Sequence, residues 1–63
     1  MRIEFYQPKP RREDWRVKVN GMTLGLVWRD GDEYIASVKT KARFATKEQA
    51  FAAARKQVKS VAL

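Results

Sequence analysis

The sequence contains no cysteine and no histidine. Their absence excludes disulfide bonds, thiolate catalysis and the usual zinc ligands, and it removes the commonest general acid or base. The sequence also lacks an apolar run of about 20 residues, which a membrane span needs, and it has no glycine-rich phosphate loop. We therefore expect no enzyme activity, no cofactor, no metal site and no membrane partner, and a cytoplasmic location, which suits a disulfide-free basic chain.

The chain is rich in positive charge, with 14 Lys and Arg against seven Asp and Glu and a net charge of +7. Such an excess favours a polyanionic partner, and nucleic acid is the first candidate. A chain of this length is predicted to form one small domain over residues 1–63. Its core must be thin, because a domain of about 60 residues buries only about 60% of its unfolded surface.

Apolar and polar residues alternate with a period of two after residue 14, which predicts antiparallel strands. Asn20-Gly21 and Asp30-Gly31 are hairpin signals, because tight hairpin turns need residues that accept a positive φ. The three predicted strands are residues 15–19, 22–29 and 33–44.

The period changes to 3.6 after residue 44 and predicts a helix over residues 47–60. Thr46 and Gln49 have the spacing of a capping box, which marks a helix start. The predicted fold class is therefore α+β, of β-β-β-α type, with a three-stranded antiparallel sheet packed on one C-terminal helix over residues 15–60.

The first 14 residues are either an additional N-terminal strand, over residues 2–6, or a basic arm. Pro8 and Pro10 favour an extended backbone there, so residues 7–14 are interpreted as a linker or loop. This segment carries Lys9, Arg11 and Arg12, which would form an auxiliary arm on a nucleic-acid backbone or minor groove. The alternative is a solvated loop without a binding role.

Every second residue of a strand has the same parity, and its side chain points to the same face of the sheet. The predicted core combines the residues of one parity on each strand with one stripe of the helix. Both tryptophans share this parity, so both are interpreted as structural. The predicted core residues are Trp15, Val17, Val19, Leu24, Leu26, Trp28, Tyr34, Ala36, Val38, Phe44, Phe51, Ala54 and Val58.

The opposite parity is expected to form an uncovered, basic face of the sheet. Glu33, at the start of the third predicted strand, is grouped with the acidic turn of Asp30 and Asp32. No other acidic residue shares this parity inside the predicted strands, although like charges on neighbouring strands repel each other. A face of one sign therefore indicates an anionic partner; the alternative is a solvated basic face that provides solubility and protects the sheet edge. The six candidate binding residues are Arg16, Lys18, Arg29, Lys39, Lys41 and Arg43.

The same predicted face contains no aromatic residue. Proteins that bind single strands usually stack bases on exposed aromatic side chains. A sheet with Arg, Lys, Thr and Ser but no aromatic residue is better suited to a duplex, where a sheet can enter the major groove and place cations on phosphates. The sequence therefore favours a duplex as ligand.

Residues 43–50, RFATKEQA, resemble the F-x-T-K-x-x-A junction of AP2-like, arm-type DNA-binding domains at the N-termini of phage and transposon tyrosine integrases. The resemblance covers about residues 15–58. It implies a three-stranded sheet backed by a C-terminal helix, with the sheet face in the DNA major groove, and an origin in a phage or mobile element.

Residues 46–54, TKEQAFAAA, are similar to the last helix of double-stranded RNA-binding domains, which begins S-K-K-x-A and continues into an Ala-Ala pair. Lys47 and the alanines match this pattern, and Glu48 stands where that family has a second lysine. This second resemblance implies duplex RNA as a ligand.

The sequence thus predicts a small nucleic-acid-binding domain, with duplex DNA preferred over RNA. The alternative is a protein-interaction module, such as a small phage-type accessory or inhibitor protein. In that case the basic face would meet an acidic protein surface, or an edge strand would pair with a partner strand. The sequence predicts no oligomeric state.

Overall fold

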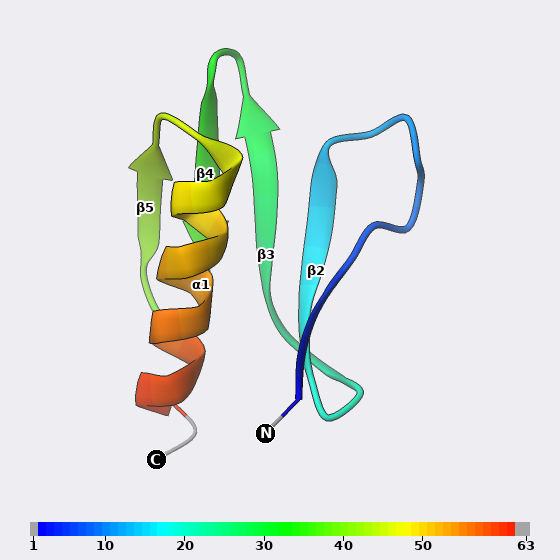
Figure 1. Cartoon of the computed structure of the whole chain (residues 1–63), viewed down its shortest axis with the longest axis vertical. Helices are drawn as coiled ribbons and strands as arrows, with labels where there is room; N and C mark the ends of the chain where they lie inside the picture. Colours follow the sequence, from blue (N-terminus) through cyan, green and yellow to red (C-terminus); the bar gives the residue numbers. More distant parts are fainter. Residues whose placement is uncertain (1, 62–63) are drawn as a thin grey trace.

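The computed structural model describes residues 2–61, which form one antiparallel sheet and a C-terminal helix (Figure 1). The elements are β1 (Ile3–Tyr6), β2 (Asp14–Val19), β3 (Met22–Asp30), β4 (Glu33–Ser37), β5 (Lys41–Phe44) and α1 (Lys47–Val61). The five strands lie side by side in the order of the sequence. The predicted α+β class is confirmed, whereas the predicted number of strands is too low.

The two additional strands arise at opposite ends of the predicted sheet. Residues 3–6 pair antiparallel with β2 as β1, which confirms the alternative of an N-terminal strand. The predicted strand over residues 33–44 is wrong: it is divided into β4 and β5, with Ser37 opposite Lys41. The turn between them is held by α1, where Gln57 Oε1 accepts hydrogen bonds from the amides of Lys39 and Thr40 at 2.8 and 3.0 Å. No glycine, proline or asparagine marks this turn in the sequence.

A β-bulge in β3 changes which of its residues face the helix. Val17 pairs with Gly25, but the next residue of β2, Lys18, pairs with Thr23. Leu24 is therefore an extra residue on β3. An extra residue inverts the alternation of side chains from that point on, since successive side chains of a strand point to opposite faces.

The inverted alternation moves three large apolar side chains of β3 from their predicted places. Val27 pairs with Trp15 and is fully buried on the helix side. Leu26 and Trp28 lie on the opposite face, where Leu26 is 48% exposed and Trp28 is partly exposed. The prediction that Leu26 and Trp28 belong to the core is therefore wrong, and Val27 takes their place.

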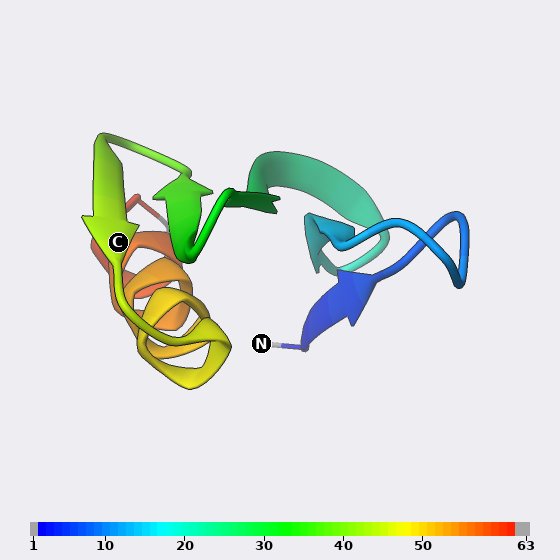
Figure 2. The ribbon, with the colours of Figure 1, turned by 90° about the horizontal axis from the view of Figure 1, so that it is seen from above.

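The core lies between the sheet and α1. Its buried members are Trp15, Val17, Val19, Val27, Ala36, Ala50, Ala54 and Val58. Ile3, Phe5, Leu24, Tyr34, Val38, Phe44 and Phe51 pack against them and are partly buried. The Phe51 ring stacks on Phe5 of β1 with 4.1 Å between centroids and meets Trp15 edge-on at 5.2 Å. These aromatic contacts tie β1 to the helix, and the sheet curves around α1 (Figure 2).

The N-terminus of α1 has the predicted capping box. The Gln49 amide donates to Thr46 Oγ1 at 3.2 Å. In return, Gln49 Oε1 accepts from the amides of Thr46 and Ala45 at 3.3 and 3.2 Å. The two side chains therefore satisfy amides that have no partner inside the helix.

Thr46→Ala is expected to destabilise the protein by roughly 1 kcal/mol, because the substitution removes the acceptor for the Gln49 amide. Chemical denaturation should show a lower midpoint with an unchanged slope. Thr40→Ala, in the exposed turn before β5, is the matched control and should change the midpoint much less. Equal midpoints for Thr46→Ala and the parent protein would contradict the capping role.

Candidate nucleic-acid interface

We call the side of the sheet turned away from α1 the outer face; because the sheet curves around the helix, this face is convex (Figure 2). Directly opposite residues of neighbouring strands point to the same side of a sheet. The pairing register therefore defines the rows of this face. One row contains Tyr6, Arg16, Leu26, Ser37 and Lys41, a second contains Asp14, Trp28, Ile35 and Arg43, and a third contains Glu4, Lys18 and Thr23.

Two of the six predicted binding cations do not lie on the outer face. Arg29 pairs with Tyr34 on the helix side, because the bulge in β3 inverts its orientation. Lys39 lies in the turn between β4 and β5 and belongs to no strand. The structure therefore brings together Arg16, Lys18, Lys41 and Arg43 only.

The predicted single sign of the outer face is also wrong. Glu4 lies on it because β1 joins the sheet, and Asp14 lies on it because β2 begins one residue earlier than predicted. Arg43 is paired with two acids of the β3–β4 hairpin, Asp30 at 2.9 Å and Glu33 at 3.5 Å. Arg43 therefore holds this hairpin to β5 and has less free charge to offer a ligand.

Three cations of the outer face remain available. Within residues 2–61, none of Arg16, Lys18 and Lys41 forms an ion pair with a carboxylate. Arg16 and Lys41 belong to the same row across the sheet, and Lys18 lies one row away on β2. The uncompensated charge of the face is therefore concentrated away from the β3–β4 turn, where Asp30 and Glu33 lie.

Two aromatic side chains lie among these cations, contrary to the prediction that the face has none. Tyr6 is 47% exposed, and Lys18 Nζ lies 4.7 Å from the centre of its ring. Lys41 Nζ lies 5.8 Å from the centre of the Trp28 ring. Both distances are within the range of cation–π attraction. The outer face therefore combines cations with aromatic rings.

One sequence signal could have revealed the position of Trp28. A glycine inside a strand pattern is typical of a β-bulge, and Gly25 interrupts the apolar run of β3. A bulge at that point turns Trp28 outward. Tyr6 was missed for another reason, since its place on the sheet depends on whether residues 2–6 form a strand.

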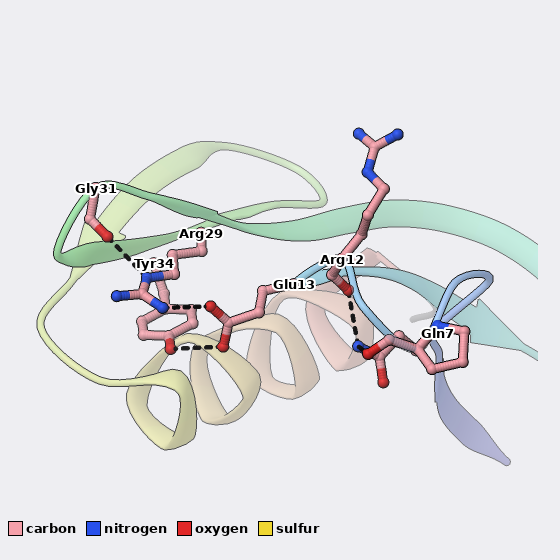
Figure 3. A network of polar contacts seen from close by, with 7 residues as sticks. Gln7, Arg12, Glu13, Arg29, Gly31 and Tyr34 are labelled. Atoms are coloured by element: carbon pink, nitrogen blue, oxygen red, sulfur yellow. Dashed lines mark hydrogen bonds and ion pairs between the residues drawn. The ribbon is translucent and has the colours of Figure 1, made fainter.

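The loop over residues 7–13, between β1 and β2, carries the three cations of the predicted arm. Gln7 Nε2 donates to the carbonyl oxygens of Arg12 at 2.7 Å and Pro10 at 3.4 Å (Figure 3). The Arg12 amide donates to the Lys9 carbonyl oxygen at 3.1 Å. The segment is thus a loop closed by its own hydrogen bonds, and it presents Arg11 and Arg12 from a defined backbone.

Glu13 fixes the end of this loop to the β3–β4 hairpin (Figure 3). Glu13 Oε2 accepts from Arg29 Nη1 at 2.5 Å, and Oε1 accepts from the Tyr34 hydroxyl at 3.3 Å. Arg29 Nε also donates to the Gly31 carbonyl oxygen at 2.8 Å. The hydrogen bond from Arg29 lowers the pKa of Glu13, and the same bond raises the pKa of Arg29. Arg29 therefore attaches the end of the loop to the β3–β4 hairpin and lies on the helix side of the sheet, away from the outer face.

The lowered pKa of Glu13 predicts a small dependence of stability on pH. Its ionised form is favoured in the folded protein, so its contribution is present above the ordinary pKa and is lost as the pH falls through the folded value. Glu13→Gln should lower the denaturation midpoint at neutral pH, and this deficit should shrink as the pH falls below the ordinary glutamate pKa of about 4.3. Asp32→Asn, in the exposed β3–β4 turn, is the control. A deficit of Glu13→Gln that is constant with pH would contradict this assignment.

Comparisons of the chain with protein-family models, curated proteins and solved structures found no match. Within residues 2–61, no three side chains of metal-ligating type lie together. No helix in this part of the chain is long and apolar enough to cross a membrane. The resemblances to integrase arm-type domains and to double-stranded RNA-binding domains therefore stay predictions.

Proposed function

We propose that this protein is a small nucleic-acid-binding domain that holds its ligand on the outer face of the sheet. The observation that carries the proposal is the arrangement of Arg16, Lys18 and Lys41, without ion pairs in residues 2–61, among Tyr6 and Trp28. Such cations neutralise phosphates, and the aromatic rings offer apolar surfaces for bases. The net charge of +7 favours the same class of ligand.

The aromatic side chains change which nucleic acid this face fits best. Duplex DNA is the ligand predicted from the sequence, because that prediction placed no aromatic residue on the face. Bases in a duplex are stacked on each other and offer no free ring surface, whereas a single strand does. With Tyr6 and Trp28 on the face, single-stranded nucleic acid becomes the preferred ligand. Duplex DNA and duplex RNA are then the ligands against which its binding is compared.

A protein-interaction module is the second candidate, supported by the exposed apolar side chains of β3. Leu26 is 48% exposed in the middle of the outer face, and Met22 is 68% exposed near the β2–β3 turn. Large apolar side chains at the centre of a surface patch are typical of protein interfaces. This candidate predicts weak and equal binding to all nucleic acids.

The proposed function is tested by titrating single-stranded DNA, duplex DNA and duplex RNA at two salt concentrations, with fluorescence anisotropy as the readout. The variant Arg16→Ala/Lys41→Ala should weaken single-strand binding strongly. The slope of log affinity against log salt should also fall by about one unit for each lost phosphate contact. The matched control, Lys56→Ala/Lys59→Ala, removes the same charge from the exposed side of α1 and should weaken binding much less.

Three results of this titration would contradict the proposal. Equal losses in the two double variants would show that binding depends on net charge alone and not on the outer face. Tighter binding of either duplex than of the single strand would overturn the preferred ligand. No binding at low salt would overturn the nucleic-acid function itself.

A further inference from the structure

A groove lies between the loop over residues 7–13 and strand β3. It has a volume of about 540 Å³; Arg11 and Arg12 line it from the loop, and Leu26 and Trp28 line it from β3. This volume is within the usual range for small-molecule sites, about 300–1,000 Å³. The groove is therefore large enough for one base with its sugar and phosphate.

Arg11 is the arginine of the groove that is available to a ligand. Its side chain is exposed and forms no ion pair within residues 2–61. The other two arginines of the groove compensate its two acids, since Arg12 lies 3.6 Å from Asp14 and Arg29 pairs with Glu13. The unpartnered Oδ1 atom of Asp14 is closed to solvent, so a ligand in the groove does not reach it. The charge left over is that of Arg11, and it attracts an anion.

Trp28 borders the groove with the side of its ring that faces the loop. Lys41 Nζ lies 5.8 Å from the centre of this ring and comes from β5, which lies beyond β4 on the other side of β3 from the loop. The ring is therefore approached by Lys41 from one side and lines the groove on the other. An aromatic ring beside a free arginine is the combination that binds a base and its phosphate.

The loop wall of the groove is fixed before any ligand binds. Gln7 closes the loop from within through the Arg12 carbonyl oxygen, and the Glu13 side chain attaches its end to Arg29 (Figure 3). A second contact, from the Arg29 amide to the Glu13 carbonyl oxygen at 2.9 Å, joins the loop to β3. A fixed wall lowers the entropy that a ligand must overcome on binding.

We propose that this groove binds one unpaired nucleotide of the bound single strand, whichever base it carries. The base stacks on Trp28, and the phosphate next to it binds Arg11. This inference rests on the proposed function and adds to it a subsite that includes the loop over residues 7–13.

The tolerance for all four bases follows from the groups that the groove offers. Every base has an aromatic face, so stacking discriminates little between them, and a phosphate contact carries no sequence information. The carboxylates of Glu13 and Asp14, which could accept hydrogen bonds from the edge of a base, are held by Arg29 and Arg12. A base inside a duplex is covered by its neighbours, so the subsite accepts only an unpaired nucleotide.

The experiment uses fluorescence anisotropy with the shortest oligothymidine that binds the parent protein with full affinity. In one series, each thymidine in turn is replaced by an abasic nucleotide. The abasic replacement at the position on Trp28 should weaken binding about tenfold, and this loss should disappear in Trp28→Leu. Adenine, guanine or cytosine at the same position should change the affinity by less than about threefold.

In a second series, each phosphate in turn is replaced by an uncharged methylphosphonate. One replacement next to the position on Trp28 should weaken binding to the parent protein, and this loss should disappear in Arg11→Ala. Arg11→Ala should also lower the slope of log affinity against log salt by about one unit. Lys56→Ala, which removes the same charge from the exposed side of α1, is the matched control and should keep the sensitivity to this replacement.

The outcomes separate this inference from the proposed function. If Arg11→Ala responds to every methylphosphonate as Lys56→Ala does, or Trp28→Leu responds to every abasic nucleotide as the parent protein does, the subsite is overturned and the binding function stands. Sensitive positions that are not adjacent, or a tenfold preference for one base, also overturn the subsite. If the parent protein binds no oligothymidine at low salt, both are overturned. The Arg11 series decides the question even if Trp28→Leu does not fold, because Arg11 is exposed on the loop.

Discussion

Trp15→Ala is expected to unfold the protein. The side chain is 8% exposed and belongs to the buried cluster under α1. Its ring meets Phe51 edge-on at 5.2 Å and lies 6.4 Å from Tyr34, so it joins the helix to β2 and β4. Truncation of a buried tryptophan costs about 3–5 kcal/mol. A domain this small is expected to have a stability near the lower end of about 5–15 kcal/mol, so most of it would be lost. Far-UV circular dichroism with chemical denaturation would measure the effect.

Trp28→Ala is the matched control, since it removes the same side chain from the outer face. Trp28 is partly exposed, so this variant should stay folded with a smaller loss of stability. It should also lose about tenfold or more in affinity for single strands, because stacking of one base contributes about 1–3 kcal/mol. The sequence predicted equal structural roles for the two tryptophans. If both variants unfolded alike, the place of Trp28 on the outer face would be contradicted.

Gly25→Ala is expected to destabilise the protein by about 3 kcal/mol, although alanine is usually tolerated in a strand. A Cβ atom at this position would clash with the Ser37 carbonyl oxygen and would lie 2.7 Å from Val38 Cγ2 and 2.9 Å from Val38 Cα. Two of these three atoms belong to the backbone, so relief requires the end of β4 to move away from β3. Chemical denaturation should show a strongly lowered midpoint.

Gly31→Ala is the control for Gly25→Ala. Gly31 has a φ of 65° and open space around the position of a Cβ, so its substitution costs backbone strain without a clash. This variant should lose about 1 kcal/mol. If Gly25→Ala were no less stable than Gly31→Ala, the close approach of the Ser37–Val38 backbone to β3 would be contradicted.

Local features of the fold could be predicted because the sequence itself provides their interactions. Asn20 and Gly21 have φ values of 52° and 85°, which few other residues adopt easily. The capping box of α1 requires only Thr46 and Gln49, three residues apart. The alternation of β2 correctly placed Trp15, Val17 and Val19 in the core and Arg16 and Lys18 on the outer face.

Part of the candidate site could be predicted for the same reason, and part could not. Arg16 and Lys18 are on a strand whose alternation is unbroken, so their side of the sheet follows from parity. Lys41 keeps its predicted side because an odd number of residues, 38–40, separates it from Ser37, the residue opposite. Trp28 and Arg29 follow the bulge, so parity places both on the wrong side. The groove between the loop over residues 7–13 and β3 was not predictable, since it forms only when these two segments, which are distant in the sequence, lie beside each other.

By itself, the sequence determined the periodicity of each element, the two glycine-containing hairpins and the start of the helix, because these depend on neighbours a few residues apart. Tertiary structure decided which of the sequence's alternatives is adopted at the bulge beside Gly25 and in residues 2–6, and it alone decided the division into β4 and β5. A one-residue shift in register exchanges the two faces of a strand at little local cost. The choice therefore depends on distant contacts, such as Val27 under the helix and the Gln57 side chain over the turn before β5.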